Sequence, residues 1–497
     1  MKTKKDLFYA AAAVTFAVAA VAYTFWGYFN LGATLSCLLF LLLSTCYLAD
    51  RTQKPGVFSC LCGGLALFSS LVYTLSTDVL FKFLGIPLIL GLTAIYLSGL
   101  GANLRYWQGG YKIILDIVRT LFILPLAHLG TVMKNLFARA ANKRPAKIWA
   151  ILLGVCAAFP ILLIVIPLLI RADAAFSDLM LQLAENLSDT LAQIILGLLL
   201  APFIITLLYS LKKGLDKPCQ AAEKTSKIPS VNSVGVVSFL SAICFCYLIY
   251  LFSQLAYFFN GFAGILPNSW NVVDYAKRGF FEICVIAAIN LTVVFASSAL
   301  VSRRKAGILP VSVKALNLFI SFFTLLLIAT AQAKMVMYIQ DFGMTRLRLL
   351  TSLFMGLLML IYFAVILRLF IRRFPYMKAI IIAGSVVFLA AWGLTPIQKD
   401  INALVCEYNI SAYTKGELDS FDLSYLSSLG SSSTFYLIEI ADDTAFPTEI
   451  REQARGILRQ RAEEKTADEK GGLKSYNYIK SAEAQALRHW TVEHKKP

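Results

Sequence analysis

The chain has 497 residues, of which 58% are hydrophobic and 15% are charged, and its formal net charge is +17. A soluble domain has roughly 25% charged residues, so this composition argues against a soluble globular protein. The basic excess lies before Pro396, because the last segment holds 13 Lys/Arg against 16 Asp/Glu. Basic residues between apolar runs are topology signals rather than a nucleic-acid-binding face, and we expect no nucleic-acid partner.

The first expected element is a transmembrane bundle over residues 1–396. Uncharged runs of about 20 residues recur there, and each can cross a bilayer core of about 30 Å as a helix. Gly27, Asn30 and Gly32 divide the first uncharged stretch into two spans. We expect eleven spans, at roughly 7–28, 32–49, 56–76, 83–101, 148–170, 190–211, 233–257, 280–301, 315–338, 349–368 and 378–396.

The basic residues orient this bundle. With the N-terminus in the cytoplasm, the inward loops carry 26 Lys/Arg and the outward loops carry six. By the positive-inside rule, an odd number of spans then leaves the C-terminus outside. Ala20-Val21-Ala22 also fits a signal-peptide cleavage site, although the apolar run continues through Phe25 and Trp26. Cleavage there would leave ten spans and the same C-terminal side.

Residues 111–133 are apolar but carry Lys112, Asp116 and Arg119 at helical spacing. Charges on one face are typical of an amphipathic interfacial helix, here within a basic cytoplasmic loop. We expect it to anchor on the bilayer surface, where anionic lipid attracts the basic loops. A protein-docking helix is the alternative.

Residues 397–497 are expected to form a small, soluble, α-helical, extracytoplasmic domain. Candidate helices lie at 401–410, 419–429 and 434–440, and another begins at Pro447. Beyond Lys465 the chain is polar, and we expect it to fray. The predicted fold class is therefore all-α: a polytopic membrane bundle with a helical outer domain.

The ten cysteines do not indicate a metal centre. Eight lie in apolar runs, where cysteine behaves as a small hydrophobe, and there is no Cys-x-x-Cys pair. The three histidines are scattered, so we expect no metal and no cofactor. We also find no catalytic motif, and the sequence favours a protein that is not an enzyme without settling the point.

Ionisable residues at membrane depth are candidate functional residues because they are costly to bury. In the threading above, one such group lies near the outer leaflet and predicts a polar, outward-facing cavity. The alternative is structural: Lys334 snorkels to the interface, and Arg278 pairs with Glu282 four residues on. The group consists of Asp274, Tyr275, Arg278, Glu282, Lys334, Asp341, Arg346 and Arg348.

Four short stretches together resemble a family of bacterial polytopic membrane proteins known as a domain of unknown function, numbered 4173 and related to 4153. The resemblance implies a bacterial cytoplasmic membrane protein and a shared outward feature at 274–282 and 345–348. It implies no substrate, cofactor or catalytic residue. The stretches are 171–176 (Arg-Ala-Asp-Ala-Ala-Phe), 274–282 (Asp-Tyr-Ala-Lys-Arg-Gly-Phe-Phe-Glu), 343–348 (Gly-Met-Thr-Arg-Leu-Arg), and Asn402-Ala403 with Tyr408-Asn409-Ile410.

Three functions remain open. The leading hypothesis is a transporter or permease that handles a small solute or lipid through the polar outward group. The second is a membrane scaffold or sensor that displays the C-terminal domain and couples it to cytoplasmic partners. A lipid- or glycan-modifying enzyme ranks last, because no carboxylate pair or histidine cluster supports it.

Overall fold

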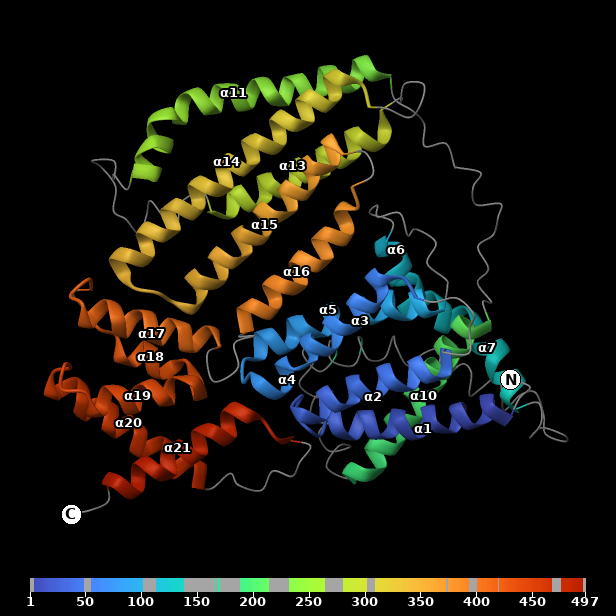
Figure 1. Ribbon diagram of the computed structural model, residues 1–497, viewed down its shortest axis with the longest axis horizontal. Helices are drawn as coiled ribbons and strands as arrows, with labels where there is room; N and C mark the ends of the chain where they lie inside the picture. Colours follow the sequence, from blue (N-terminus) through green and yellow to red (C-terminus); the bar gives the residue numbers. More distant parts are fainter. Residues whose placement is uncertain are drawn as a thin grey trace. The chain divides into compact units, whose positions relative to one another are not determined.

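The computed structural model of the protein is built from helices (Figure 1). Within the described part of the chain every regular element is helical, which confirms the predicted all-α class. The structure describes residues 4–48, 55–101, 113–137, 165, 169, 188–213, 232–263, 280–301, 309–371, 374–392, 400–418, 420–466 and 475–494.

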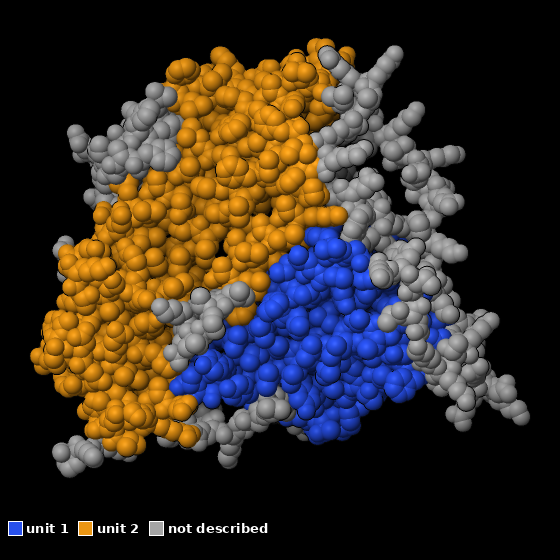
Figure 2. All heavy atoms as spheres, viewed as in Figure 1, with its two compact units in different colours: residues 1–107, 111–219, 466–482 blue, residues 108–110, 220–465, 483–497 orange. Residues whose placement is uncertain are grey.

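The chain divides into two compact units, shown in different colours in Figure 2. Unit 1 comprises residues 1–107, 111–219 and 466–482, and unit 2 comprises 108–110, 220–465 and 483–497. The helices of unit 1 are α1 (Lys4–Thr24), α2 (Leu31–Leu48), α3 (Val57–Ser70), α4 (Val72–Leu75), α5 (Val79–Leu100), α6 (Ile113–Val118), the π-helical η1 (Arg119–Ile123), α7 (Leu124–Phe137) and α10 (Asp189–Lys213). Those of unit 2 are α11 (Ser233–Ala263), α13 (Phe280–Leu300), α14 (Val311–Phe342), α15 (Arg346–Phe370), α16 (Tyr376–Trp392), α17 (Ile401–Thr414), α18 (Leu423–Ser428), the short η3 (Gly430–Ser432), α19 (Ser433–Asp442) and α20 (Thr448–Thr466). α21 (Tyr478–His494) begins in unit 1 and continues in unit 2.

Nine helices of the described residues are long and apolar enough to cross a membrane. Two shorter apolar helices, Phe8–Thr24 and Tyr376–Trp392, match the first and last predicted spans. The predicted span 148–170 lies almost wholly outside the described residues. The count of eleven spans therefore stays a prediction.

One of the nine helical runs, Ile113–Gly130, falls where the interfacial helix is expected. Its polar face packs inside unit 1: Asp116 is 2% exposed, and the Thr120 and Ser98 hydroxyls lie 2.6 Å apart. Its apolar residues Leu115 and Phe122 are more than half exposed. A helix with an apolar outer face can lie in lipid either flat or across it, so the interfacial assignment also stays a prediction.

In unit 1, helices α1 and α10 approach so closely that a side chain would not fit between them. A Cβ at Gly197 would lie 2.4 Å from Cα of Val18, so the contact requires glycine. At the N-terminal end of α1 the buried Asp6 accepts a hydrogen bond from the Tyr47 hydroxyl (3.3 Å) and lies 3.7 Å from Nζ of Lys212. A buried carboxylate is stable only with such partners.

In unit 2, buried polar side chains link the apolar helices. Asn290 of α13 accepts a hydrogen bond from the Tyr247 hydroxyl (2.6 Å) and donates one to Oγ1 of Thr324 (2.9 Å). The Tyr362 hydroxyl of α15 donates to the Ala287 carbonyl (2.6 Å). Hydrogen bonds of this kind hold membrane helices together where burial of apolar surface cannot.

After the last apolar helix, α17 to α20 and most of α21 enclose a hydrophobic core that includes Val405, Leu437 and Leu458. Met344 and Leu349, beside and within the first turn of α15, pack against the same core. The four expected helices are present as α17, α18, α19 and α20.

The expectation that the chain frays beyond Lys465 is wrong for residues 478–494, which form α21. Its buried face contains Leu487 and Trp490, together with Glu483, which is 3% exposed. Glu483 accepts a hydrogen bond from Thr434 (2.7 Å) and lies 3.9 Å from the Arg461 guanidinium. These partners make a buried carboxylate tolerable, so a polar sequence could still form a packed helix.

Candidate functional site

The α14–α15 turn consists of Gly343, Met344 and Thr345. Gly343 has φ 74° and ψ 172°, a backbone conformation that is essentially restricted to glycine. Thr345 then caps α15 by accepting a hydrogen bond from the Arg348 amide (3.3 Å). The sequence Gly-Met-Thr thus encodes an abrupt end of one membrane helix and the start of the next.

The Arg348 side chain stabilises this turn by contacts with the end of α14. Its guanidinium donates to the carbonyls of Phe342 (2.9 Å) and Gly343, and it lies 3.8 Å from the ring centroid of Tyr338. The guanidinium therefore satisfies carbonyls at the end of α14, where a positive charge is also favoured by the helix dipole.

Asn409 of α17 holds the turn from the other side. Its Oδ1 accepts a hydrogen bond from the Met344 amide (2.8 Å), and its Nδ2 donates one to the Met344 carbonyl (2.7 Å). A Cβ on Gly343 would lie 2.6 Å from the same Oδ1. The Tyr425 hydroxyl also accepts a hydrogen bond from the Arg346 amide (2.7 Å). We call Asn409, Tyr425 and residues 343–346 the clamp.

Local capping fixes α17 at both ends. At its start the Asp400 side chain accepts from the Ala403 amide (2.9 Å) and from the Ser432 hydroxyl (2.7 Å). At its end Gly416 has φ 74°, and the Glu417 amide donates to the Ala412 carbonyl (2.8 Å), as in a Schellman motif. This turn sends the chain back so that Leu418 lies beside Gly343.

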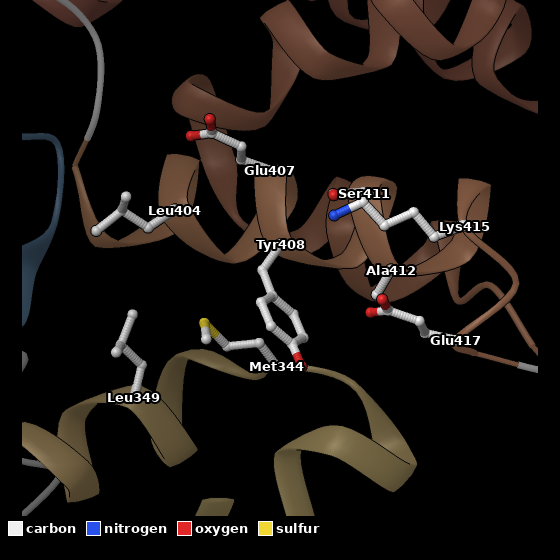
Figure 3. Close-up of a pocket in the computed structure, with 9 residues that line it drawn as sticks. All are labelled: Met344, Leu349, Leu404, Glu407, Tyr408, Ser411, Ala412, Lys415 and Glu417. Carbon is white, nitrogen blue, oxygen red and sulfur yellow. The ribbon is translucent and has the colours of Figure 1, made fainter.

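A cavity of about 570 Å³ lies beside the clamp, between α17 and the start of α15 (Figure 3). Figure 3 shows the Tyr408 ring directed from α17 towards the α14–α15 turn. The apolar lining is Met344, Leu349, Leu404 and Ala412, and the polar lining is Glu407, Tyr408, Ser411, Lys415 and Glu417. Burial, aided by the Glu417 carboxylate, raises the pKa of the Tyr408 phenol above its ordinary value.

The structure places part of the predicted polar group at this turn. Arg346 and Arg348 open α15, and the exposed Asp341 lies two residues before Gly343. Lys334 is half-buried inside α14, and Glu282 is exposed in the first turn of α13. The remaining members, Asp274, Tyr275 and Arg278, lie outside the described residues, so a shared outward cavity stays a prediction.

Sequence reasoning missed the clamp's partners in α17 and α18. Tyr408 and Asn409 belong to a stretch that carried the family resemblance, but no role was assigned to them. The available signal was that Gly343 and Asn409 both fell in short family-like motifs. Pairing those motifs needed knowledge of the tertiary structure. The basic loops expected to meet anionic lipid lie largely outside the described residues.

The comparison with protein families now bears on the chain as a whole. A family model described as a domain of unknown function, DUF4153, matches residues 61–440. The chain belongs to this family. DUF4153 is the family that the resemblance named as the related one, and membership of the one numbered 4173 is not shown. No curated protein and no solved structure matches the chain.

The DUF4153 match covers the clamp and the cavity in full, since residues 343–425 lie inside it. Together with the many apolar helices, it indicates an integral membrane protein.

Proposed function

We propose that this DUF4153 protein is a sensor or scaffold of the bacterial cytoplasmic membrane, in which an outer helical domain is coupled to the membrane helices. The observation that carries the proposal is the pair of hydrogen bonds between Asn409 and the Met344 backbone. A pair of hydrogen bonds to the backbone N–H and C=O of one residue fixes both position and orientation. Displacement of α17 is therefore passed to the α14–α15 turn without an intervening linker.

Contacts of the C-terminal region support the placement of two helix–helix turns on the same side of the membrane as that region. Asn477 donates to the carbonyls of Tyr73 (3.3 Å) and Ser76 (2.9 Å) in unit 1, before α5. Asn409 binds the α14–α15 turn within unit 2. Both asparagines follow the last apolar helix of the described residues, so they share one side of the membrane. The positive-inside rule assigns that side to the exterior.

On this proposal, the number of crossings between Ser76 and Gly343 is even. Besides 113–130, five candidate spans of the described residues lie between them, namely α5, α10, α11, α13 and α14. One further crossing is needed, supplied either by 113–130 or by 148–170 but not by both. The predicted threading uses 148–170.

Site-specific labelling tests the orientation. Glu449→Cys places a thiol at an exposed position of α20, whereas Cys406 is fully buried with its pKa raised by burial to about 12. In intact cells an impermeant maleimide should label the Glu449→Cys variant. The wild-type protein, which keeps Glu449, gives the background labelling from the other cysteines. Labelling only after the membrane is permeabilised contradicts the proposed orientation.

The coupling is tested by Asn409→Ala, which should reproduce the phenotype of deleting residues 400–497 while the protein still reaches the membrane. Asn402→Ala is the matched control, because Asn402 is buried in the same helix and makes no hydrogen bond to the turn. Normal function of Asn409→Ala, in a strain where the gene deletion has a phenotype, would refute coupling through the clamp.

Transport through the bundle is the second candidate, favoured by Lys334. This half-buried lysine lies eight residues before the end of α14, and nearby Gln332 has a buried Oε1 that accepts no hydrogen bond within the described residues. A cation held at membrane depth is a common feature of solute pathways. If Lys334→Ala and Glu282→Gln abolish uptake of a solute while Asn409→Ala does not, transport replaces coupling.

A further inference from the structure

The cavity beside the clamp has the characteristics of a binding site for an amphiphile. Its volume of about 570 Å³ is within the range of small-molecule sites, roughly 300–1,000 Å³. Met344, Leu349 and Leu404 give it an apolar side. Leu349 belongs to the first turn of a candidate membrane span, so this side begins where the helix enters lipid.

The lipid-facing character continues outside the cavity. Leu347, in the first turn of α15, is 74% exposed, and Phe342, at the end of α14, is 51% exposed. Large apolar side chains that stay exposed on membrane helices are expected to meet acyl chains. An acyl chain lying along α15 would bring its headgroup to the level of α17.

The polar side of the cavity carries both signs of charge. The Schellman turn at Gly416 places Lys415 and Glu417 at the C-terminal end of α17, and Glu407 adds a second carboxylate. Figure 3 shows the Lys415 ammonium directed back towards Ser411, and the Glu417 carboxylate on the same side as the Tyr408 ring. In this view the Glu407 carboxylate is directed away from the Tyr408 ring. Glu417 and the negative end of α17 therefore favour a ligand ammonium, and Lys415 favours one anionic group beside it.

We propose that this cavity binds the headgroup of a phospholipid in which a primary ammonium lies next to a phosphate, that is, an ethanolamine phospholipid. The phosphate is paired with Lys415 and with the hydroxyls of Ser411 and Tyr408. The ammonium donates hydrogen bonds to Glu417, and the acyl chains follow Leu349 and Leu347. This ligand acts at the junction on which the proposed function rests, because Met344 is both a wall of the cavity and the residue held by Asn409.

The headgroup chemistry makes specific exclusions. A choline headgroup keeps the positive charge but has no N–H to donate to Glu417, and a glycerol headgroup has no positive charge. Ethanolamine lipid should therefore bind more tightly than either. Loss of a hydrogen bond to a charged group corresponds to about a tenfold change in affinity.

The test uses full-length protein in nanodiscs of choline phospholipid, doped with ethanolamine phospholipid that carries a photoactivatable diazirine. After irradiation, cross-linked peptides should map to residues 404–417 or 344–349. Unlabelled ethanolamine phospholipid should compete, whereas unlabelled glycerol phospholipid should not. Equal competition by glycerol lipid overturns the assignment, and so does the absence of cross-linking at these residues against the excess of choline host lipid.

Matched variants locate the binding. Lys415→Ala and Glu417→Gln should each reduce cross-linking at this site about tenfold. Arg459→Ala and Glu449→Gln remove exposed charges from α20, outside the cavity, and should leave cross-linking unchanged. All four positions are exposed, so folding should survive, and the elution profile of each variant verifies it. Unchanged cross-linking in Lys415→Ala and Glu417→Gln overturns the proposal.

Three further outcomes separate the possible failures. If free glycerophosphoethanolamine competes as strongly as the lipid, a soluble metabolite replaces the membrane lipid as ligand. If the cavity variants lose lipid binding but show the wild-type phenotype in cells, the ligand is assigned correctly and the proposed sensing role is wrong. If ethanolamine lipid does not bind but Asn409→Ala still reproduces the deletion, the coupling stands and this ligand is wrong.

Discussion

Two asparagines, Asn409 and Asn477, attach the C-terminal region to backbone at the ends of apolar helices, but they do so differently. Asn409 both donates to and accepts from one residue, Met344, in a turn that contains Gly343. Asn477 only donates to that backbone, at the carbonyls of Tyr73 and Ser76, and its Oδ1 caps its own helix by accepting from Lys480 (3.2 Å).

The difference shows which contact is specified by both partners. The Asn409 contact needs a glycine on the opposite side, since a Cβ at Gly343 would collide with Oδ1. The Asn477 contact needs only free carbonyls at a helix end, which any sequence can supply. The first lies inside the matched family region and the second lies beyond it. We therefore regard the Asn409 contact as the functional connection and the Asn477 contact as an anchor.

Gly343→Ala should break this comparison most strongly. The backbone conformation costs a non-glycine residue about 1–3 kcal/mol, and displacement of Asn409 costs about 1–3 kcal/mol more. Gly416→Ala is a matched control, because Gly416 has the same φ of 74° with open space around it. The thermal unfolding temperature of the full-length protein should fall clearly further for Gly343→Ala than for Gly416→Ala. Equal shifts would mean that the collision with Asn409 is unimportant.

Asn409→Ala and Asn477→Ala should act locally and separately. Hydrogen exchange should speed up at the Met344 amide in the first variant and at the Lys480 amide in the second, because each amide loses its acceptor. The expected free-energy cost is about 1–3 kcal/mol in each case. If Asn409→Ala also accelerates exchange at Lys480, the two contacts do not act independently.

Tyr425→Phe sharpens the comparison with a smaller effect. It removes the acceptor of the Arg346 amide and should cost about 1 kcal/mol, visible as faster exchange at that amide. Tyr413→Phe is the control, since the Tyr413 hydroxyl makes no hydrogen bond within the described residues. A similar change at Arg346 in both variants would remove Tyr425 from the clamp.

The smallest effect is a pH dependence of stability that arises from Cys406, which lies in α17, the helix that contains Asn409. Burial raises the pKa of this thiol from an ordinary value of 9.0 to about 12. The unfolded chain loses the proton above about pH 9 while the folded chain keeps it, so stability is full below pH 9 and falls towards pH 12. The slope is about 1.4 kcal/mol per pH unit for one group. Thermal unfolding of Cys406→Ala should show a shallower decline over this range, and an unchanged slope would contradict the assignment.

The membrane helices were the most predictable part of the molecule. A charge-free run that crosses lipid must form a helix, because the bilayer core offers its backbone groups no other hydrogen-bond partners. The predicted spans 32–49 and 56–76 correspond to α2 and to α3 with α4. The C-terminal helices expected at 401–410 and 419–429 are also present, and in the structure Asp400 and Asp422 cap them by binding amides in their own helices.

The contacts that build the candidate site could not be predicted in this way. α21 was missed because its buried face includes Glu483, which reads as a surface residue until Thr434 and Arg461 are placed beside it. The clamp was missed because Met344 and Asn409 are 65 residues apart, and because the Asn409 side chain binds the backbone of Met344, so the Met344 side chain carries no signature of the contact. Long-range contacts of this kind are properties of the packed chain rather than of any segment.

The length of α14 has a consequence for the depth of the clamp. Its 32 residues extend about 48 Å, well beyond a hydrocarbon layer of about 30 Å, whereas the 25 residues of α15 extend about 37 Å. Two helices of unequal length that share one turn must tilt or project, and the balance depends on how thick the host bilayer is. Membrane thickness should therefore control how deeply the turn at Gly343 sits among the headgroups.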